Sequence, residues 1–273
     1  MMETSSPPAA AEPTLSVVMP AYNEEPSLRQ SVQAVLTRVH GLLELVLVND
    51  GSSDRTGHIA DQLAREDPRI RVIHQPRNQG KTAALKTGFA ATRGDIVIVQ
   101  DADLEYDPAE IEAVVDPIRR GFADVVYGSR FLVRKAARIL YFYHYLANKA
   151  LTFFSNVCTN LNMTDVETCY KAFRGDIIRN MTITSTGFGF EIEVTAKVAK
   201  LKCRIYEVPI SYYGRTFEEG KKIGFKDGIA AGLYIIRYNL FCSLRSSYVR
   251  LPNVGVGATA PASSSTSVHR ASA

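Results

Sequence analysis

The chain has 273 residues, of which 46% are hydrophobic and 22% are charged, and its formal net charge is +4. This composition is ordinary for a soluble globular protein, and the length fits one large domain or two small ones. So small a net charge argues against wholesale nucleic-acid binding, and no apolar run reaches the ~20 residues that span a bilayer.

The termini and the cysteines are typical of a cytosolic protein. Residues 1–13 have neither a basic start nor an apolar core, so we do not expect a signal peptide. These residues and residues 252–273 are rich in small residues and proline, which predicts two disordered tails. None of the cysteines forms a Cys-x-x-Cys pair, so we expect reduced thiols rather than disulfides or zinc ligands. They are Cys158, Cys169, Cys203 and Cys242.

Apolar strands and amphipathic helices alternate through the first part of the chain. Strands are predicted over residues 15–20, 43–48, 70–74 and 95–99, and helices over residues 27–39, 54–66 and 80–91. Ser27 is placed to cap the first of these helices and Asp54 the second. The alternation predicts βαβ units and an α/β fold with a mainly parallel sheet.

The pattern is less regular after residue 103. It predicts helices over residues 109–120 and 190–201, strands over 123–127, 172–174 and 203–208, and a long aromatic-rich segment over 138–160. The chain shows no internal repeat.

Polar and acidic residues gather where the predicted strands end. Residues 20–24, 49–51 and 101–103 each directly follow a strand, and ligands of parallel sheets bind beyond the carboxyl ends of their strands. Asp101 and Asp103 would offer a hard divalent cation the oxygen ligands that it prefers. The plain alternative is that these acids only solubilise the end of a strand.

Taken in order, the motifs resemble the family 2 glycosyltransferases with a GT-A fold, and more narrowly the dolichol-phosphate mannosyltransferase branch. The matching segments are VVMPAYNEE, LVLVNDGSSDRT, NQGKTAALKTGFAATRGDIVIVQDADLEYDP, DVVYGSRF, TDVETCYKAFR, FGFEIEVTAKV and YEVPISYYGRTFEEGKKI. The resemblance implies transfer of a hexose from a nucleotide sugar to a polyprenyl phosphate. It also implies one GT-A domain over residues 14–245, with a nucleotide-sugar half (14–107) and an acceptor half (108–245).

By this resemblance, two strand-end segments hold the nucleotide of the donor. Pro20, Tyr22 and Glu24 match the first segment, and Val48 and Asp50 match the second. The Tyr22 ring offers a stacking face for a base, and the Glu24 carboxylate accepts hydrogen bonds from a ribose or base. The alternatives stay open: Tyr22 would be a core aromatic, Glu24 an acid at the start of a helix, and Asp50 with Gly51 a simple turn.

Asp101, Ala102, Asp103 and Glu105 match the segment that binds metal and diphosphate. The resemblance implies that Asp103 is a direct ligand of Mg²⁺ or Mn²⁺, that Asp101 reaches the ribose or the metal, and that Glu105 completes the metal set. The cation would offset the charge of the departing nucleoside diphosphate, acting as a Lewis acid and a template.

Basic residues are expected on the phosphate side of the site. Arg130 matches an arginine that faces the acceptor phosphate, and Arg215 and Lys221 match a basic pair that reaches phosphates across the site. Arginine suits bidentate phosphate contact, whereas lysine acts as a point charge. The predicted catalytic residues are therefore Asp101, Asp103, Arg130 and Arg215. The alternative is a solvent-facing basic patch. Lys81, near a helix start, would meet either phosphate or solvent.

The chemistry of the acceptor decides whether the enzyme needs a base. A phosphate monoester is already anionic near pH 7 because its second pKa is about 6, whereas a hydroxyl acceptor needs a carboxylate within hydrogen-bond reach. Asp165, Glu167 and Glu191 are the candidate bases, and we expect Asp165 to shape the site instead. Attack opposite the leaving group would invert the anomeric centre. Two rival functions stay open: a transferase that builds a polysaccharide or cell-wall glycan on a hydroxyl acceptor, and a non-catalytic nucleotide-sugar-binding protein.

Many relatives in this branch carry C-terminal transmembrane helices, and this chain departs from that pattern. Residues 130–154 and 228–243 combine aromatic and basic side chains, which suits an anionic membrane surface. We expect a cytoplasmic protein that is peripheral at the cytoplasmic face of the membrane, or one that a separate membrane subunit anchors. Packing against the core or a dimer partner is the alternative. The choice between GDP-mannose and UDP-glucose types of donor stays open, as does the oligomeric state.

Overall fold

The computed structural model describes residues 12–132, 138, 141–216 and 225–254. Its strands are β1 (Leu15–Ala21), β2 (Leu42–Asn49), β3 (Ile70–His74), β4 (Ile96–Val99), β5 (Val125–Ser129), β6 (Lys171–Arg174) and β7 (Ile205–Pro209). Its helices are α1 (Leu28–Arg38), α2 (Thr56–Glu66), α3 (Lys81–Ala91), the 3-10 turn η1 (Pro108–Glu110), α4 (Ile111–Arg119), α5 (Phe142–Thr159), α6 (Gly175–Asn180), α7 (Phe190–Leu201), α8 (Phe225–Leu240) and α9 (Leu244–Ser247). The strands form one mainly parallel sheet in the order β3-β2-β1-β4-β6-β5-β7, which confirms the predicted α/β class.

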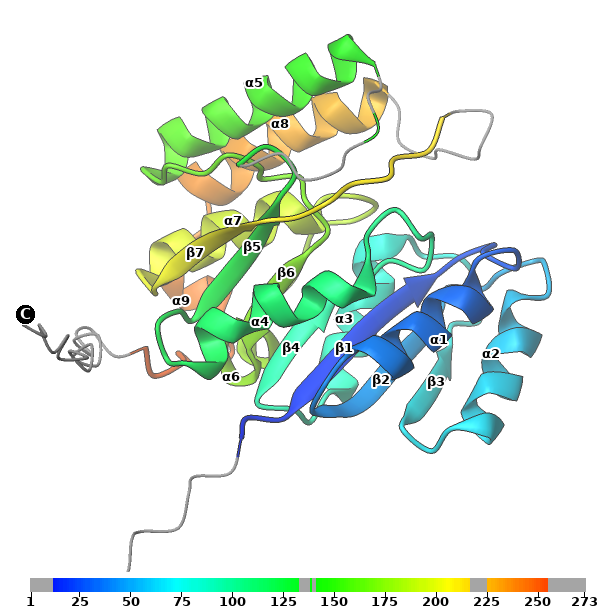
Figure 1. Cartoon of the computed structure of the whole chain (residues 1–273). Helices are drawn as coiled ribbons and strands as arrows, with labels where there is room; N and C mark the ends of the chain where they lie inside the picture. The colour runs from blue at the N-terminus through cyan, green and yellow to red at the C-terminus, as the bar shows by residue number, and fades with distance from the viewer. Residues whose placement is uncertain (1–11, 133–137, 139–140, 217–224, 255–273) are drawn as a thin grey trace, which may run out of the picture.

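The order in which the chain adds strands to the sheet reverses between β3 and β4. β1 pairs in parallel with both β2 and β4, so the chain runs outward from β1 to β3 and then returns to β4. Helices α1 and α2 therefore cover one face of the sheet and α3 covers the other (Figure 1). At such a reversal the loops diverge and leave a crevice at the carboxyl ends of the strands.

β6 joins the two halves of the sheet. It pairs antiparallel with β4 on one side and with β5 on the other, so β4 and β5 run in the same direction. Ala172 of β6 pairs with Ile98 of β4 and with Val126 of β5, which places those two residues level with each other. The ends of β4 and β5 therefore emerge at the same edge.

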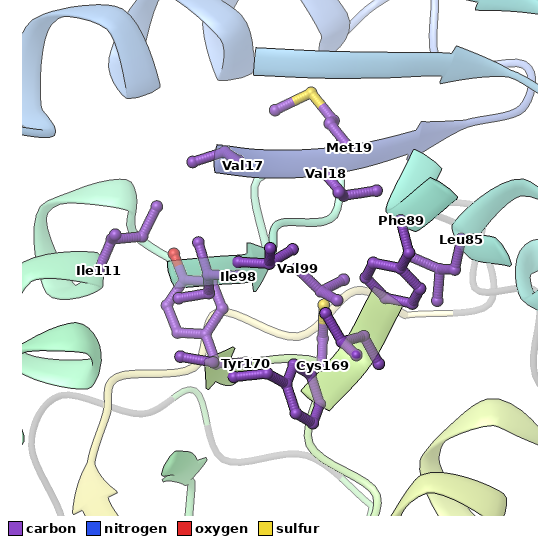
Figure 2. Packing of buried hydrophobic residues seen from close by; sticks show 14 of the residues in the cluster. Val17, Val18, Met19, Leu85, Phe89, Ile98, Val99, Ile111, Cys169 and Tyr170 are labelled. Atoms are coloured by element: carbon purple, nitrogen blue, oxygen red, sulfur yellow. The ribbon is translucent and has the colours of Figure 1, made fainter. Parts of the chain in front are cut away.

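Close packing makes the strands beneath this edge rigid. Figure 2 shows Leu85 and Phe89 of α3 on one side of β4 and Ile111 of α4 on the other. All three side chains are buried in the same core cluster. Gly88 lets α3 approach β1 closely, because a Cβ atom at this position would lie 2.4 Å from Val18 Cγ1. Such density leaves little freedom for the strands to shift.

Some local predictions differ from the structure for identifiable reasons. Asp54 is not the N-cap residue of α2, because the helix begins at Thr56 and Arg55 holds that position. Ser27 does not cap α1, because its hydroxyl donates to Glu24 Oε2 at 2.8 Å. The helix expected over residues 109–120 begins as η1, which Asp107 caps by accepting from Ala109 N. The strand expected over residues 123–127 begins at Val125, since Ala123 N donates to the Pro117 carbonyl and closes α4 instead.

Helices α5 and α8 form an outer layer over α7 (Figure 1). Large apolar side chains on these two helices face outward, and Phe153 and Leu233 are 71% and 63% exposed. We call the following set the apolar face of α5 and α8: Phe142, Tyr143, Leu146, Phe153, Val157, Ile229, Leu233, Ile236 and Leu240. Across the described ranges, no helix is both long and apolar enough to cross a membrane. The four cysteines are free thiols, as predicted, whereas the expected disordered tails fall largely outside the described residues.

Candidate active site

A pocket of about 380 Å³ opens at the carboxyl ends of β1, β2 and β4. This volume lies in the range of small-ligand sites, roughly 300–1,000 Å³. Three strand-end segments, the start of α3, the loop before α7 and the segment after β7 supply its walls. The lining residues are Pro20, Ala21, Tyr22, Glu24, Asp50, Asn78, Gly80, Lys81, Ala84, Asp101, Ala102, Asp103, Glu105, Gly187, Phe188, Tyr212 and Arg215.

An acidic turn follows β4 and brings three predicted residues to this pocket. Asp101, Asp103 and Glu105 all line it. Leu104 has a φ of 63°, a left-handed conformation that non-glycine residues rarely adopt. Glu105 N donates to Asp103 Oδ1 at 3.1 Å and closes the turn. The strained Leu104 backbone thus supports a turn that directs the acids at positions 103 and 105 into the same pocket.

The acids of this turn crowd one another. Burial raises the pKa of Asp103 to about 7; the charges of Asp101 and Glu105 add to the rise, and Arg215 only partly offsets it. Such a concentration of hard oxygen ligands fits Mg²⁺ or Mn²⁺. Within the described ranges, no three His, Cys, Asp or Glu side chains are placed to hold a metal by themselves. This still suits magnesium, which takes one or two protein carboxylates and completes its shell with water and phosphate.

Arg215 lies directly against these acids. Its Nη2 is 2.8 Å from Asp103 Oδ2, its Nε is 3.2 Å from Glu105 Oε1 and its Nη1 is 3.5 Å from Glu24 Oε2. Tyr212, three residues earlier, donates its hydroxyl to Glu105 Oε2 at 2.9 Å. The segment after β7 therefore closes over the acidic turn. Lys221, expected to act with Arg215, lies outside the described residues.

Lys81, for which the sequence left solvent and phosphate as alternatives, is a pocket residue. Its Nζ lies 2.9 Å from Asp101 Oδ2 and 3.3 Å from Glu191 Oε1. Burial by itself would lower the pKa of the Lys81 ammonium, but the charges of Asp101 and Glu191 raise it well above its ordinary value. A permanently charged lysine at the start of α3 can meet an anionic ligand.

The residues expected to hold the nucleotide divide into two groups. Pro20, Tyr22, Glu24 and Ala102 line the pocket, whereas Val48 is fully buried in the core and does not reach it.

Asp50 lines the pocket and also shapes it. Its carboxylate accepts from Gln79 N at 2.9 Å and from Gly80 N at 2.8 Å. Burial raises the Asp50 pKa despite these two bonds. Asp50 thus fixes the loop that leads into α3, and any contact with a nucleotide is additional to that role.

Arg130, at the end of β5, lies beside the pocket rather than in its lining. Its Nε and Nη2 each lie 2.7 Å from an oxygen of Asp165, so the two side chains form a bidentate pair. Its guanidinium carbon is 5.0 Å from the centre of the Tyr212 ring, which does line the pocket. Asp165 therefore orients Arg130, a pairing that the sequence did not predict. Tyr212, which was not among the predicted site residues, connects Arg130 with Glu105.

The other two candidate bases have unusual surroundings. Glu167 Oε1 and Glu191 Oε2 are buried and have no hydrogen-bond partner among the described residues. Burial raises the pKa of Glu167 to about 7, and the nearby Glu191 charge adds to the rise, while Lys171 and Arg130 oppose it. A carboxyl group with such a pKa is poised to exchange a proton near neutral pH.

The site agrees with the comparison to known families. Residues 16–182 match the family described as glycosyl transferase family 2. The chain belongs to this family. The resemblance read from the motifs is thereby confirmed, and the chain is a hexosyltransferase rather than a non-catalytic binding protein.

Two curated relatives cover most of the chain. It is 32% identical to an undecaprenyl-phosphate mannosyltransferase from Micrococcus luteus, over 76% of this chain and 86% of that protein. It is 30% identical to a polyprenol monophosphomannose synthase from Mycolicibacterium smegmatis, over 80% of this chain and 84% of that one.

Solved structures show the same fold. Glucosyl-3-phosphoglycerate synthase from Mycobacterium tuberculosis, crystallised with Mn²⁺, UDP and glucosyl-3-phosphoglycerate, superposes with a TM-score of 0.66. Its sequence is 21% identical, and the match covers 83% of this chain and 80% of that one. The similarity supports the GT-A architecture.

Proposed function

We propose that this enzyme transfers a hexose from a nucleotide diphosphate sugar of the GDP-mannose or UDP-glucose type to a polyprenyl phosphate, with inversion at the anomeric carbon. The observation that carries the proposal is the opposition of charges at one edge of the sheet. Asp101, Asp103 and Glu105 follow β4, while Arg130 follows β5 and is already paired with a carboxylate. Two relatives are named for a polyprenyl-type phosphate acceptor or product, which supports the same assignment.

On the donor side, Asp103 with one of its neighbours Asp101 and Glu105 would hold Mg²⁺ or Mn²⁺, which when bound supplies Lewis-acid stabilisation of the leaving diphosphate. Pro20, Tyr22, Glu24 and Asp50 would surround the nucleoside. Lys81, whose ammonium is held in the pocket by Asp101 and Glu191, would add a second cation near the diphosphate.

On the acceptor side, Arg130 would position the phosphate that attacks. This phosphate needs no base, because its second pKa is about 6 and it is anionic at neutral pH. It does need a cation in a fixed orientation, and the bidentate contact with Asp165 provides that orientation. Arg215 would bind phosphate oxygens from the other wall of the pocket.

The apolar face of α5 and α8 would place the enzyme on the membrane that holds such a lipid. Monomeric soluble proteins rarely expose contiguous apolar patches of more than a few hundred Å². Peripheral association of this face with the cytoplasmic leaflet, or with a membrane-anchoring subunit, would bring the lipid phosphate to the pocket.

A second candidate acceptor is a sugar hydroxyl in a polysaccharide or cell-wall glycan. The observation that favours it is Glu167, whose buried carboxyl group has a pKa of about 7 and an oxygen without a partner among the described residues. Glu167 does not itself line the pocket, so it would accept the proton of an attacking hydroxyl only where the acceptor reaches past the lining residues.

One assay separates the two acceptors. Purified protein is incubated with membranes and a panel of radiolabelled UDP- and GDP-sugars, with and without EDTA. We expect a solvent-extractable glycolipid that mild acid cleaves, and we expect EDTA to abolish its formation. Label found only in water-soluble glycan would refute the phosphate acceptor and support a sugar hydroxyl as the acceptor.

A further inference from the structure

A positively charged side chain of the protein itself, Arg215, already lies against the acidic turn. The guanidinium of Arg215 contacts Asp103, Glu105 and Glu24, with N···O distances of 2.8, 3.2 and 3.5 Å. The Arg215 side chain is only 23% exposed, so these contacts lie in a region that is partly shielded from water. Asp103 and Glu105 are the same carboxylates that would bind a divalent cation.

Further bonds fasten the segment of Arg215 to Glu105. Arg215 N donates to Glu105 Oε1 at 3.0 Å, and Tyr212 donates its hydroxyl to Glu105 Oε2 at 2.9 Å. Tyr213 N donates to the Glu105 carbonyl oxygen at 2.9 Å. Both carboxylate oxygens of Glu105 therefore accept hydrogen bonds from the segment of Arg215, and a metal ion that binds Glu105 competes with these donors.

A guanidinium and a divalent cation compete for these carboxylates. Both would lie within a few ångströms of Asp103, where like charges in a partly buried site repel strongly. Displacing Arg215 into water would leave its charge without the carboxylates that now balance it. A diphosphate removes this difficulty, because its oxygens can ligate the metal and accept the bidentate bonds of an arginine at the same time.

We propose that Arg215 and the divalent cation exclude each other from Asp103 and Glu105, and that the diphosphate of the donor receives the displaced Arg215. The inference rests on the proposed function only in taking a nucleotide diphosphate as the ligand. It follows that metal and nucleotide bind with positive coupling, and that each increases the affinity for the other by the same factor. Metal alone binds weakly because it competes with Arg215.

Mn²⁺ binding tests this without any turnover. Free Mn²⁺ is measured by electron paramagnetic resonance, alone and with UDP or GDP, after correction for the metal that the nucleotide binds in solution. In the native protein we expect the nucleotide to tighten Mn²⁺ binding at least tenfold, within the usual range of coupling between sites. In Arg215→Gln we expect Mn²⁺ alone to bind roughly three- to tenfold more tightly, and the nucleotide to tighten Mn²⁺ binding by a smaller factor than in the native protein.

Two further variants complete the design. Arg215→Lys keeps the charge but cannot bridge two carboxylates with a planar fork, so its affinity for Mn²⁺ alone should fall between those of the other two proteins. Arg69→Gln removes an arginine that pairs with Asp67 away from the pocket, and it should bind Mn²⁺ as the native protein does. Circular dichroism establishes that each variant is folded, and if Arg215→Gln is not, Arg215→Lys alone decides.

The proposal is overturned if Arg215→Gln, or Arg215→Lys in its place, binds Mn²⁺ alone no more tightly than the native protein. It is also overturned if native Mn²⁺ affinity is the same with and without nucleotide. Failure of the proposed function has a different signature: the coupling persists with UDP or GDP, but no polyprenyl phosphate is glycosylated.

Discussion

At the scale of single residues, the site depends on side chains whose charges oppose or support one another. Asp103 illustrates this, because burial and two neighbouring acids raise its pKa to about 7. The Leu104 backbone, at a φ of 63°, maintains the turn that holds this unfavourable arrangement. Strain of this kind costs about 1–3 kcal/mol and is found where function requires a particular geometry.

Replacing Asp103 with Asn should remove a metal ligand without changing the size of the side chain. We expect transfer to fall by a factor on the order of 10²–10³, the loss typical when one group that stabilises developing charge is removed. Radiolabelled sugar transfer measures the effect. Asp116→Asn, at an exposed position on α4, is the matched control and should keep native activity. Full activity in Asp103→Asn would contradict the metal role.

Arg130→Lys should weaken the hold on the acceptor. Lysine cannot reproduce the two parallel bonds to Asp165 or present a fork to phosphate. Because a charge-assisted bond contributes about 1.5–3 kcal/mol, we expect the KM for polyprenyl phosphate to rise roughly 10- to 100-fold.

The affinity of Arg130→Lys for the nucleotide should not change, and equilibrium titration with UDP or GDP checks this. Arg29→Lys, on the exposed pair with Glu66, serves as the control. A rise in nucleotide Kd equal to the rise in acceptor KM would place Arg130 on the donor side instead.

At the scale of secondary-structure elements, one buried carboxylate ties together the ends of three strands. Asp124, just before β5, contacts Arg204 ahead of β7 at 2.9 Å and Arg174 at the end of β6 at 3.1 Å. Burial alone would raise the Asp124 pKa, but hydrogen bonds from the two arginines lower it below its ordinary value. This cluster lies at the edge of the sheet opposite the pocket, where it fixes β5, β6 and β7 relative to one another.

Asp124→Asn should therefore destabilise the fold by about 1–3 kcal/mol at pH 7, as expected for loss of charge-assisted hydrogen bonds. The folded pKa is lowered, so the contribution is fully present above the unfolded value of about 3.9 and is lost as the pH falls through the folded pKa. Urea unfolding at pH 7 and near pH 3 measures both effects. The difference between native and variant proteins should be smaller at the acidic pH, and a constant difference would contradict the assignment.

The helices, strands and their contacts show which features of the protein could be predicted from the sequence. β3 and α7 occupy the predicted residues. Asp101 and Asp103 were identifiable because they follow a buried strand. The roles of Lys81 and Glu191 were not, since their ion pair joins residues 110 positions apart and only the tertiary fold brings them together. The contact between Arg215 and Glu105 is likewise non-local, so the family motif placed Arg215 near phosphates but did not reveal its pairing with Glu105.

At the scale of the whole molecule, α5 and α8 form an outer layer over α7 (Figure 1), and the apolar face of α5 and α8 lies on this layer. α8 packs on both α5 and α7, so its inner side is already covered while its outer side is exposed. The fold therefore carries an apolar surface that its own core does not use.

Charged residues on this surface should prevent membrane association. Phe153→Glu together with Leu233→Glu should weaken binding to anionic lipid vesicles at least tenfold, since burying one large apolar side chain contributes about 1.5–3 kcal/mol. Vesicle co-sedimentation measures the change. Val249→Glu, an equally exposed apolar position beyond α9, is the control. Unchanged vesicle binding by the double variant would show that this face does not contact lipid.

The antiparallel strand β6 fixes the distance between the ends of β4 and β5. Because Ile98 and Val126 both pair with Ala172, Asp101 and Arg130 emerge two strand spacings apart, a separation of roughly 10 Å in the backbone. This interval is set by ladder hydrogen bonds and not by flexible side chains. Loop changes elsewhere in the pocket should therefore leave the backbone distance between Asp101 and Arg130 almost unchanged. The same scaffold can therefore accept different substrates while this backbone distance stays the same.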